Sequence, residues 1–240
     1  MQNLGQTRSS HQRDHFLMTP DTFVRAPLPG MHDATAIVHV GPVRGAGFTQ
    51  YTVEMGAQGR FATGNRQAFL WVLEGSITTP EGLSTSRQYA YLPGDGEAAI
   101  SSNGEARVVV IEKPYTSMGN ARPAALTGDE RKIFPKPLMG DEALEVRTLL
   151  PDDAAFDFAV NTLTFQPGAS LPMVEIHVME HGLLMLQGEG IYRLNDHWYP
   201  VRAGDFIYMA PYCPQWFCAV GKQPAKYLLY KDWNRHPFSS

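Results

Sequence analysis

The sequence predicts an all-β protein made of two tandem small barrels. Short segments in which apolar and polar residues alternate recur along the whole chain, and most of them end at Gly, Pro, Asn or Asp. The 240 residues include 22 Gly and 18 Pro, which is typical of a chain with many turns and short strands. A stretch in the first half also resembles a stretch in the second half, and such self-similarity predicts two copies of one β-unit.

The expected strands follow one another along the chain with short gaps. Each is rich in β-branched or aromatic residues, which pack well on a pleated sheet. They are expected at residues 34–40, 48–55, 68–78, 106–113, 158–165, 190–194, 205–209 and 225–231. Helical periodicity is confined to two short segments, at residues 128–134 and 140–150.

The internal repeat aligns residues 68–95 with residues 182–205. Each copy contains an apolar strand, a glycine (Gly75 or Gly188), a second strand, an aromatic residue and a Gly-Asp pair. The two pairs are Gly94-Asp95 and Gly204-Asp205. The alignment spans about half the chain length, so each half is expected to hold one copy.

A segment between the two copies is predicted to be the connection. Residues 114–137 are rich in Pro, Gly and small polar residues, which favour loops. We therefore expect an N-terminal barrel over residues 1–125 and a C-terminal barrel over residues 126–240. Each is long enough to bury a core of its own.

Composition and charge exclude several classes of partner. The net charge is −4 and no Lys/Arg cluster occurs, so neither a nucleic acid nor an anionic membrane is expected as a partner. No apolar run approaches the ~20 residues that span a bilayer, and the first residues lack the apolar core of a signal peptide. Cys213 and Cys218 are expected to be free thiols. These features predict a soluble cytoplasmic protein.

The stretch VEIHVMEHG, at residues 174–182, concentrates groups that bind metals: Glu175, His177 and His181. From His177 it also spells His-x-x-Glu-His, a pattern that helical zinc peptidases use. However, β-branched residues occupy alternate positions, a proline precedes the stretch and a glycine closes it. Period two favours a strand, with Glu175 and His177 on one face and the valines and isoleucine on the other. The peptidase reading is the weaker alternative.

Two interpretations of this group of side chains remain open from the residues alone. A carboxylate and two imidazoles buried together without compensation carry a desolvation cost, which a bound cation removes. The alternative is a core cluster in which Glu175 accepts hydrogen bonds from the histidines, which is stable only when every member is paired.

Two motifs here resemble the metal motifs of the cupin superfamily. Residues 167–190 resemble the first motif, with Glu175 and His177 in its two His slots and His181 in its Glu slot. Residues 204–215 resemble the second, with Gln215 in its His slot. The resemblance implies two cupin barrels, that is, double-stranded β-helix or jelly-roll barrels. It also implies four metal ligands: Glu175, His177, His181 and Gln215.

The unusual ligand set points to one family among the cupins. Residues 181–235 and 4–30 look very similar to the (S)-ureidoglycine aminohydrolase family. The resemblance implies hydrolysis of the C–N bond of (S)-ureidoglycine, a small ureide, to (S)-ureidoglycolate and ammonia in allantoin and purine ureide degradation. It also implies a homo-oligomer. One carboxylate, two imidazoles and an amide suit Mn²⁺, with Zn²⁺ or Fe²⁺ as alternatives.

The resemblance further implies which residues contact the substrate. Tyr192, Tyr227 and Lys231 match its substrate positions, and Glu175 and Gln215 would face the substrate from the metal. Lys231 would bind the substrate carboxylate as a point charge, and Glu175 would double as the base that activates water. The alternatives are core aromatic roles for the two tyrosines and a solvated edge lysine.

The N-terminal copy lacks the ligands. Counting back from Gly75, the three ligand positions of the first motif fall on Ala62, Gly64 and Ala68, none of which binds a metal. The N-terminal barrel is therefore expected to be structural and the C-terminal barrel catalytic. Two other functions stay open: a cupin dioxygenase, and a cupin that binds a metal or small ligand without catalysis.

Overall fold

The regular secondary structure of the described residues is almost all β-strand, as the sequence predicted. The computed structural model describes residues 5–117 and 122–232. Within them lie twenty strands and three short 3-10 helices, η1 (Pro20–Thr22), η2 (Pro42–Arg44) and η3 (Glu130–Lys132). In the described part of the chain, no helix has the length and apolar character needed to cross a membrane.

The chain folds into two compact units. Unit 1 contains residues 5–23, 134–152 and 158–232, and unit 2 contains residues 24–117, 122–133 and 153–157. This division departs from the expected boundary at residues 125 and 126. The segment that opens the chain joins the unit formed by the C-terminal half, and a five-residue segment returns to unit 2. Nearly all of each repeat copy nevertheless lies within a single unit.

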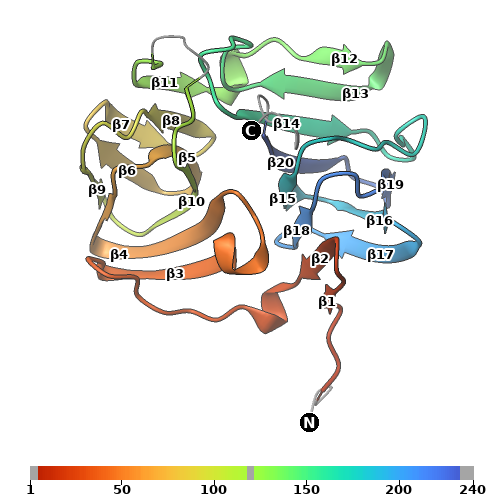
Figure 1. The fold of residues 1–240 in the computed structure, drawn as a ribbon, viewed down its shortest axis with the longest axis horizontal. Coiled ribbons are helices and arrows are strands. Elements are labelled where there is room, and N and C mark those ends of the chain that lie inside the picture. The colour runs from red at the N-terminus through yellow and green to blue at the C-terminus, as the bar shows by residue number, and fades with distance from the viewer. Residues whose placement is uncertain (1–4, 118–121, 233–240) are drawn as a thin grey trace. The chain divides into compact units, whose positions relative to one another are not determined.

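Unit 1 is built from an eight-stranded antiparallel sheet and a three-stranded one. The larger sheet runs in the order β1-β2-β18-β15-β20-β14-β13-β12, so the N-terminal strands extend it beside β18 (Figure 1). The smaller sheet runs β17-β16-β19. The bounds are β1 Ser10–His11, β2 His15–Met18, β12 Lys136–Leu138, β13 Asp141–Thr148, β14 Ala159–Phe165, β15 His181–Gln187, β16 Glu189–Leu194, β17 His197–Arg202, β18 Phe206–Met209, β19 Gln215–Val220 and β20 Ala225–Lys231.

Unit 2 is one nine-stranded antiparallel sheet. Its order is β11-β8-β5-β10-β4-β9-β6-β7, and β3 pairs with β4 outside that path. The bounds are β3 His32–Val40, β4 Thr49–Thr63, β5 Gln67–Glu74, β6 Ser76–Thr79, β7 Gly82–Thr85, β8 Gln88–Leu92, β9 Ala98–Ser102, β10 Ala106–Lys113 and β11 Leu126–Asp129. Its core gathers apolar side chains from β4, β5, β8, β9 and β10.

The repeat is visible in the strand pairing of the two units. In unit 2, β5 pairs with β8 and β10, and in unit 1, β15 pairs with β18 and β20 in the same antiparallel sense. Gly75 and Gly188 end the first strand of each set with φ of 73° and 71°. A Cβ atom on either glycine would lie within 2.5 Å of a backbone oxygen. The positive φ and the close backbone oxygen both require glycine, which explains why both copies of the repeat have glycine at this position.

Replacing Gly188 with alanine is expected to destabilise unit 1 by about 2–4 kcal/mol. A positive φ costs an alanine about 1 kcal/mol, and overpacking against Pro224 O adds about 1–3 kcal/mol. Gly168→Ala is the matched control, because Gly168 has φ of 84° but no atom within 4 Å of its Cβ position. Urea unfolding measures both variants. Equal losses in the two would show that the close contact at Gly188 carries no penalty.

The Gly-Asp pairs do not correspond in the structure, although the alignment matched them. Gly204 precedes β18, whereas Gly94 follows β8. Arg87 takes the place of Gly204: its N–H donates to Val72 O at 2.9 Å, as the N–H of Gly204 donates to Met185 O at 2.8 Å. Arg87 also has a positive φ, of 67°. The backbone turn is thus shared, and the matching dipeptide is not.

The strand predictions are largely confirmed, and the helix predictions are largely wrong. Residues 106–113 and 225–231 form β10 and β20 with the expected bounds, and Gly75 divides 68–78 into β5 and β6. Residues 140–150, predicted to be helical, contain β13, which pairs with β12 and β14. Residues 128–134 hold only the end of β11 and η3. Pairing with neighbouring strands overrides the weak local helical pattern at β13.

The expected connection at 114–137 is only partly a loop. It contains β11, which pairs with β8 over four residues and so belongs to the sheet of unit 2. It also reaches into β12. Residues 118–121 lie outside the described residues.

Candidate active site in unit 1

The segment that carries Glu175 and His177 is neither a helix nor a continuous strand. Glu175 forms an isolated antiparallel bridge with Gln215, in which each backbone N–H donates to the other's carbonyl oxygen at 2.8 and 2.9 Å. The regular strand β15 begins only at His181. Val174 and Ile176 are 39% and 60% exposed, so the alternation separates a solvent face from the face of Glu175. The helical peptidase reading is therefore wrong, and the predicted strand is shorter than expected.

Glu175, His177 and His181 are neighbours in space. Nε2 of His177 lies 3.1 Å from Oε2 of Glu175, and the imidazole rings of His177 and His181 have centroids 5.0 Å apart. The backbone N–H of Tyr212 donates to His177 O at 2.7 Å, which fixes the segment against the loop before β19. Glu175 and His177 are thus in direct contact, and the ring of His181 lies beside that of His177 at a tilt of 31°.

His181 is buried in a state that suits a metal ligand. Its Nδ1 donates to Met179 O at 3.0 Å, so Nε2 carries the free lone pair. Burial, and then the neighbouring His177, lower the pKa of His181 to about 3. The ring is therefore neutral at neutral pH. A neutral imidazole with one nitrogen anchored by a carbonyl is the usual form of a metal-binding histidine.

Gln215 is positioned by a buried tyrosine. It begins β19 and is 5% exposed. The hydroxyl of Tyr192, on β16, donates to Oε1 of Gln215 at 2.8 Å. Burial, with Glu175 and Cys213 nearby, raises the pKa of Tyr192. The phenol therefore stays protonated and holds the amide oxygen in place. The sequence predicted that Tyr192 contacts the substrate and did not predict this contact with Gln215.

Tyr227 and Lys231 come from the strand next to His181. On β20, Lys231 lies opposite His181 in register, and Tyr227 lies opposite Met185. Burial lowers the pKa of Lys231, while Asp152 and Glu175 oppose that shift. Burial, and then Tyr192 and Glu175, raise the pKa of Tyr227.

The surroundings of these two residues differ. Tyr227 is 2% exposed and packs against the rings of Phe165 and Phe217. Lys231 is half-buried at the end of its strand. Tyr227 thus combines a core role with a hydroxyl near the site, and Lys231 provides a partly desolvated cation.

These donors fit a hard-to-borderline divalent ion. The set contains one carboxylate, two imidazoles and one amide oxygen, with Nε2 of His181 free to accept a cation. However, the structure does not bring the ligand atoms of Glu175, His177 and His181 within 4.8 Å of one another. In the described part of the chain, Asp14, His15 and Cys213 alone form such a set among His, Cys, Asp and Glu side chains. The four expected ligands are neighbours rather than a closed cage.

The His-x-x-Glu-His spelling has a different explanation in the structure. Glu180 is 6% exposed, and its Oε2 accepts a hydrogen bond from the hydroxyl of Tyr208 at 3.2 Å. It therefore makes a buried polar contact on the sheet with Tyr208 of β18.

Unit 2 has different residues at the places of Glu175, His181 and Gln215. β9 pairs with β6 as β19 pairs with β16, which puts Ala98 where Gln215 stands. Ala98 pairs with Thr63, so Thr63 rather than Ala62 matches Glu175. Ala68 matches His181, because each pairs with the last residue of the neighbouring strand. The sequence matched Ala62 to Glu175, and the strand pairing shows that the matching residue is the next one, Thr63.

Comparison with known proteins identifies the family. The cupin domain family matches residues 161–230. The (S)-ureidoglycine aminohydrolase of Arabidopsis thaliana is 40% identical over 243 residues, which cover 97% of this chain and 80% of that protein. The chain belongs to the (S)-ureidoglycine aminohydrolase family. The member of this family from Escherichia coli K12 is 31% identical over 91% of this chain and 88% of its own length.

A solved structure superposes on nearly the whole of this chain. The putative glyoxylate induced protein from Pseudomonas aeruginosa superposes with a TM-score of 0.87 at 30% identity, covering 98% of this chain and 94% of that one. Both units therefore have counterparts in a structure of the same size. The all-β, cupin-like fold of the chain is confirmed.

Proposed function

We propose that this protein hydrolyses (S)-ureidoglycine to (S)-ureidoglycolate and ammonia in a site in unit 1. The observation that carries the proposal is the match to aminohydrolases over nearly the whole chain. The grouping of Glu175, His177 and His181 supports the location in unit 1. We also propose that both units are cupin barrels and that the protein acts as a cytoplasmic homo-oligomer.

Glu175, His177, His181 and Gln215 would hold a divalent ion, for which Mn²⁺ suits the donors. The ion would orient the substrate and, as a Lewis acid, polarise the substituents of the reacting carbon. The pairing of Tyr192 with Oε1 of Gln215 leaves that amide in one orientation. Because only Glu175 is anionic among the four, a bound ion keeps a net positive charge.

Lys231 and Glu175 divide the remaining work. The ammonium of Lys231 binds the substrate carboxylate, and its partial burial strengthens that attraction. Glu175 accepts the proton of the attacking water and passes it to the leaving amine, which departs as ammonia and leaves Glu175 ionised again. Tyr227 provides a protonated hydroxyl near Glu175, able to donate to the ureido oxygen.

Removal of divalent metal is expected to abolish the stereospecific release of ammonia from freshly made (S)-ureidoglycine. A chelator should reduce the rate to that of spontaneous decay, and Mn²⁺ should restore it. The measurement is ammonia release with the enantiomer of ureidoglycolate determined in parallel. Because the substrate decays unaided, the rate without protein is the baseline.

Ammonia release and oxygen uptake, measured in parallel, distinguish the competing functions. Oxygen uptake during turnover of a ketone or flavonol substrate would favour a cupin dioxygenase. Metal binding with no acceleration of ureidoglycine decay would favour a non-catalytic binding protein. Ammonia release that a chelator leaves unchanged would contradict the metal-dependent mechanism while leaving the substrate assignment intact.

A further inference from the structure

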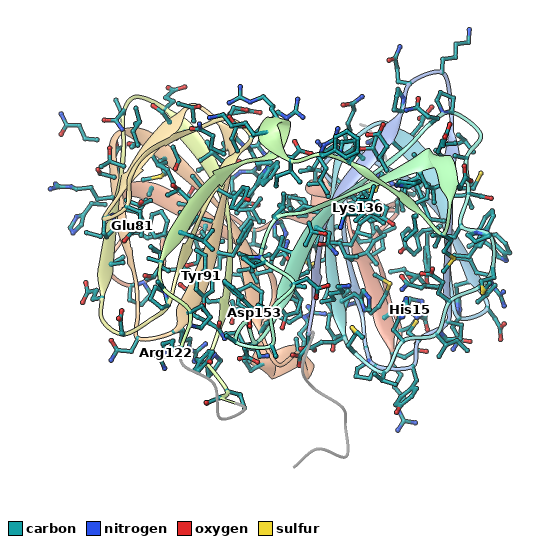
Figure 2. The ribbon with its side chains drawn as sticks, turned by 90° about the horizontal axis from the view of Figure 1, so that it is seen from above. His15, Glu81, Tyr91, Arg122, Lys136 and Asp153 are labelled. Atoms are coloured by element: carbon teal, nitrogen blue, oxygen red, sulfur yellow. The ribbon has the colours of Figure 1, made fainter. Side chains whose placement is uncertain are left out.

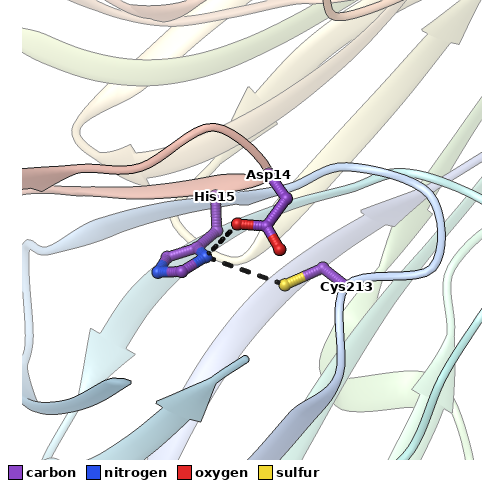
Figure 3. Close-up of side chains that lie close together, drawn as sticks. All are labelled: Asp14, His15 and Cys213. Atoms are coloured by element: carbon purple, nitrogen blue, oxygen red, sulfur yellow. Dashed lines mark hydrogen bonds and ion pairs between the residues drawn. The ribbon is translucent and has the colours of Figure 1, made fainter. Parts of the chain in front are cut away.

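Three donor side chains that are not among the four proposed ligands converge in unit 1. Asp14, His15 and Cys213 each offer one ligand atom, and these atoms all lie within 4.8 Å of one another (Figure 3). Nδ1 of His15 is 2.8 Å from Oδ1 of Asp14 and 3.9 Å from Sγ of Cys213. Ligand atoms around one tetrahedral ion at about 2.0–2.3 Å lie roughly 3.3–3.6 Å apart, so Nδ1 and Oδ1 would have to separate by about 0.5 Å for an ion to bind between the three groups.

Nδ1 of His15 faces two groups of the cluster, and the thiol of Cys213 also donates to Pro214 O at 3.7 Å. Nδ1 of His15 carries at most one proton, yet both the carboxylate and the sulfur face it (Figure 3). In a nucleophilic triad the acid and the nucleophile face opposite ring nitrogens. Here Nε2 faces the hydroxyl of Tyr199 instead, at 3.0 Å. The three groups therefore converge on a point and do not form a relay.

The sulfur and the carboxylate of the cluster lie close together. Sγ of Cys213 and a carboxylate oxygen of Asp14 are within 4.8 Å of each other. A cation between the two groups would offset the repulsion between a thiolate and a carboxylate at this separation.

The outer atoms of the cluster are already held by neighbours. Tyr199 contacts Nε2 of His15, and Nδ2 of Asn195 donates to Oδ2 of Asp14 at 2.9 Å. Metal-binding histidines and carboxylates are characteristically fixed in this way through the atom that does not bind the ion. His15 and Cys213 are 1% and 4% exposed, so two of the three ligands are rigidly packed.

We propose that Asp14, His15 and Cys213 bind a second divalent ion of the zinc class. A carboxylate, a thiolate and a neutral imidazole together carry two negative charges, which neutralise the ion in a buried place. The thiol proton passes to solvent when the ion binds. The Asp14 side chain is 32% exposed, so a water can complete the coordination from that side. Sulfur distinguishes this site from the Glu175 site, which has none.

The bound ion would link parts of the chain that are remote in sequence. His15 and Cys213 are 198 residues apart. The N–H of Ala210 donates to Asp14 O at 2.8 Å, so the N-terminal segment already contacts the loop that precedes Gln215. The ion would fix that loop to β2, and its binding free energy would add to folding.

Titration of the metal-free full-length protein with Co²⁺ tests the proposal. A thiolate bound to Co²⁺ gives a sulfur-to-metal charge-transfer band, and we expect one thiolate-bound Co²⁺ per chain. Cys213→Ser should abolish the band, whereas Cys218→Ser, the matched control at the other free cysteine, should retain it. Asp14→Asn, at a partly exposed side chain, should weaken Co²⁺ binding at this band at least about tenfold.

The outcome is independent of catalysis, because the band reports sulfur ligation alone. A wild-type protein without the band, or a Cys213→Ser variant that keeps it, would overturn the second site. Loss of the band in Cys218→Ser alone would assign the sulfur to the other cysteine and would equally overturn it. Should Cys213→Ser not fold, the Asp14→Asn titration decides: unchanged binding contradicts the proposal.

Discussion

His181→Ala is expected to lower kcat/KM for (S)-ureidoglycine by more than about 100-fold. Replacing residues that merely orient metal ligands already costs about 10- to 100-fold in metal affinity or activity, and His181 is proposed as a ligand itself. Its ring is buried, neutral and anchored through Nδ1. Alanine has no atom that replaces the free Nε2 as a ligand. Steady-state kinetics, with bound metal quantified in the same preparations, measure the effect.

His32→Ala is the control, because His32 is an exposed residue on β3 of unit 2. It should leave both metal content and kcat/KM unchanged. An active His181→Ala enzyme with full metal content would remove this residue from the proposed ligand set. High concentrations of Mn²⁺ should partly restore the variant, since the other three donors remain.

The sequence predicted the strands best where a strand is fixed by its own composition. β10 has a run of four β-branched residues and β20 has a run of four aromatic and leucine residues, and both strands have paired neighbours on each side. β13 was missed because its local pattern resembles a helix and its sheet partners decide its conformation. Such pairing is a long-range interaction, and a local periodicity does not contain it.

The sequence predicted the part of the candidate site whose residues belong to one short motif. Glu175, His177 and His181 are close in sequence, and the structure keeps them close in space. The contact of Tyr192 with Gln215 joins two strands and has no spacing that a sequence pattern could reveal. The convergence of His15 with Cys213 depends on the N-terminal segment entering unit 1, which the expected boundary at residues 125 and 126 did not include.

Asp157→Asn is expected to destabilise unit 2 by roughly 3–5 kcal/mol, the usual cost of leaving a buried charge without its partner. Nζ of Lys113 lies 2.6 Å from Oδ1 of Asp157, and the two side chains are 0% and 1% exposed. Oδ2 accepts hydrogen bonds from Nε2 of Gln67 at 2.7 Å and from the N–H of Thr116 at 2.9 Å. The hydroxyl of Tyr91, labelled in Figure 2, extends the network by donating to Gln67. Urea unfolding measures the loss.

Glu74→Ala is the matched control, because Glu74 forms a 3.0 Å ion pair with Arg107 in the same unit but is 66% exposed. It should cost less than about 1 kcal/mol, since solvent screens the pair. The double variant Lys113→Met with Asp157→Asn should recover much of the loss, because no buried charge then remains without a partner. If the double variant were as unstable as the sum of the two single ones, the charge pair would not be coupled, and the loss would instead come from the hydrogen bonds that Gln67 and Thr116 donate to Asp157.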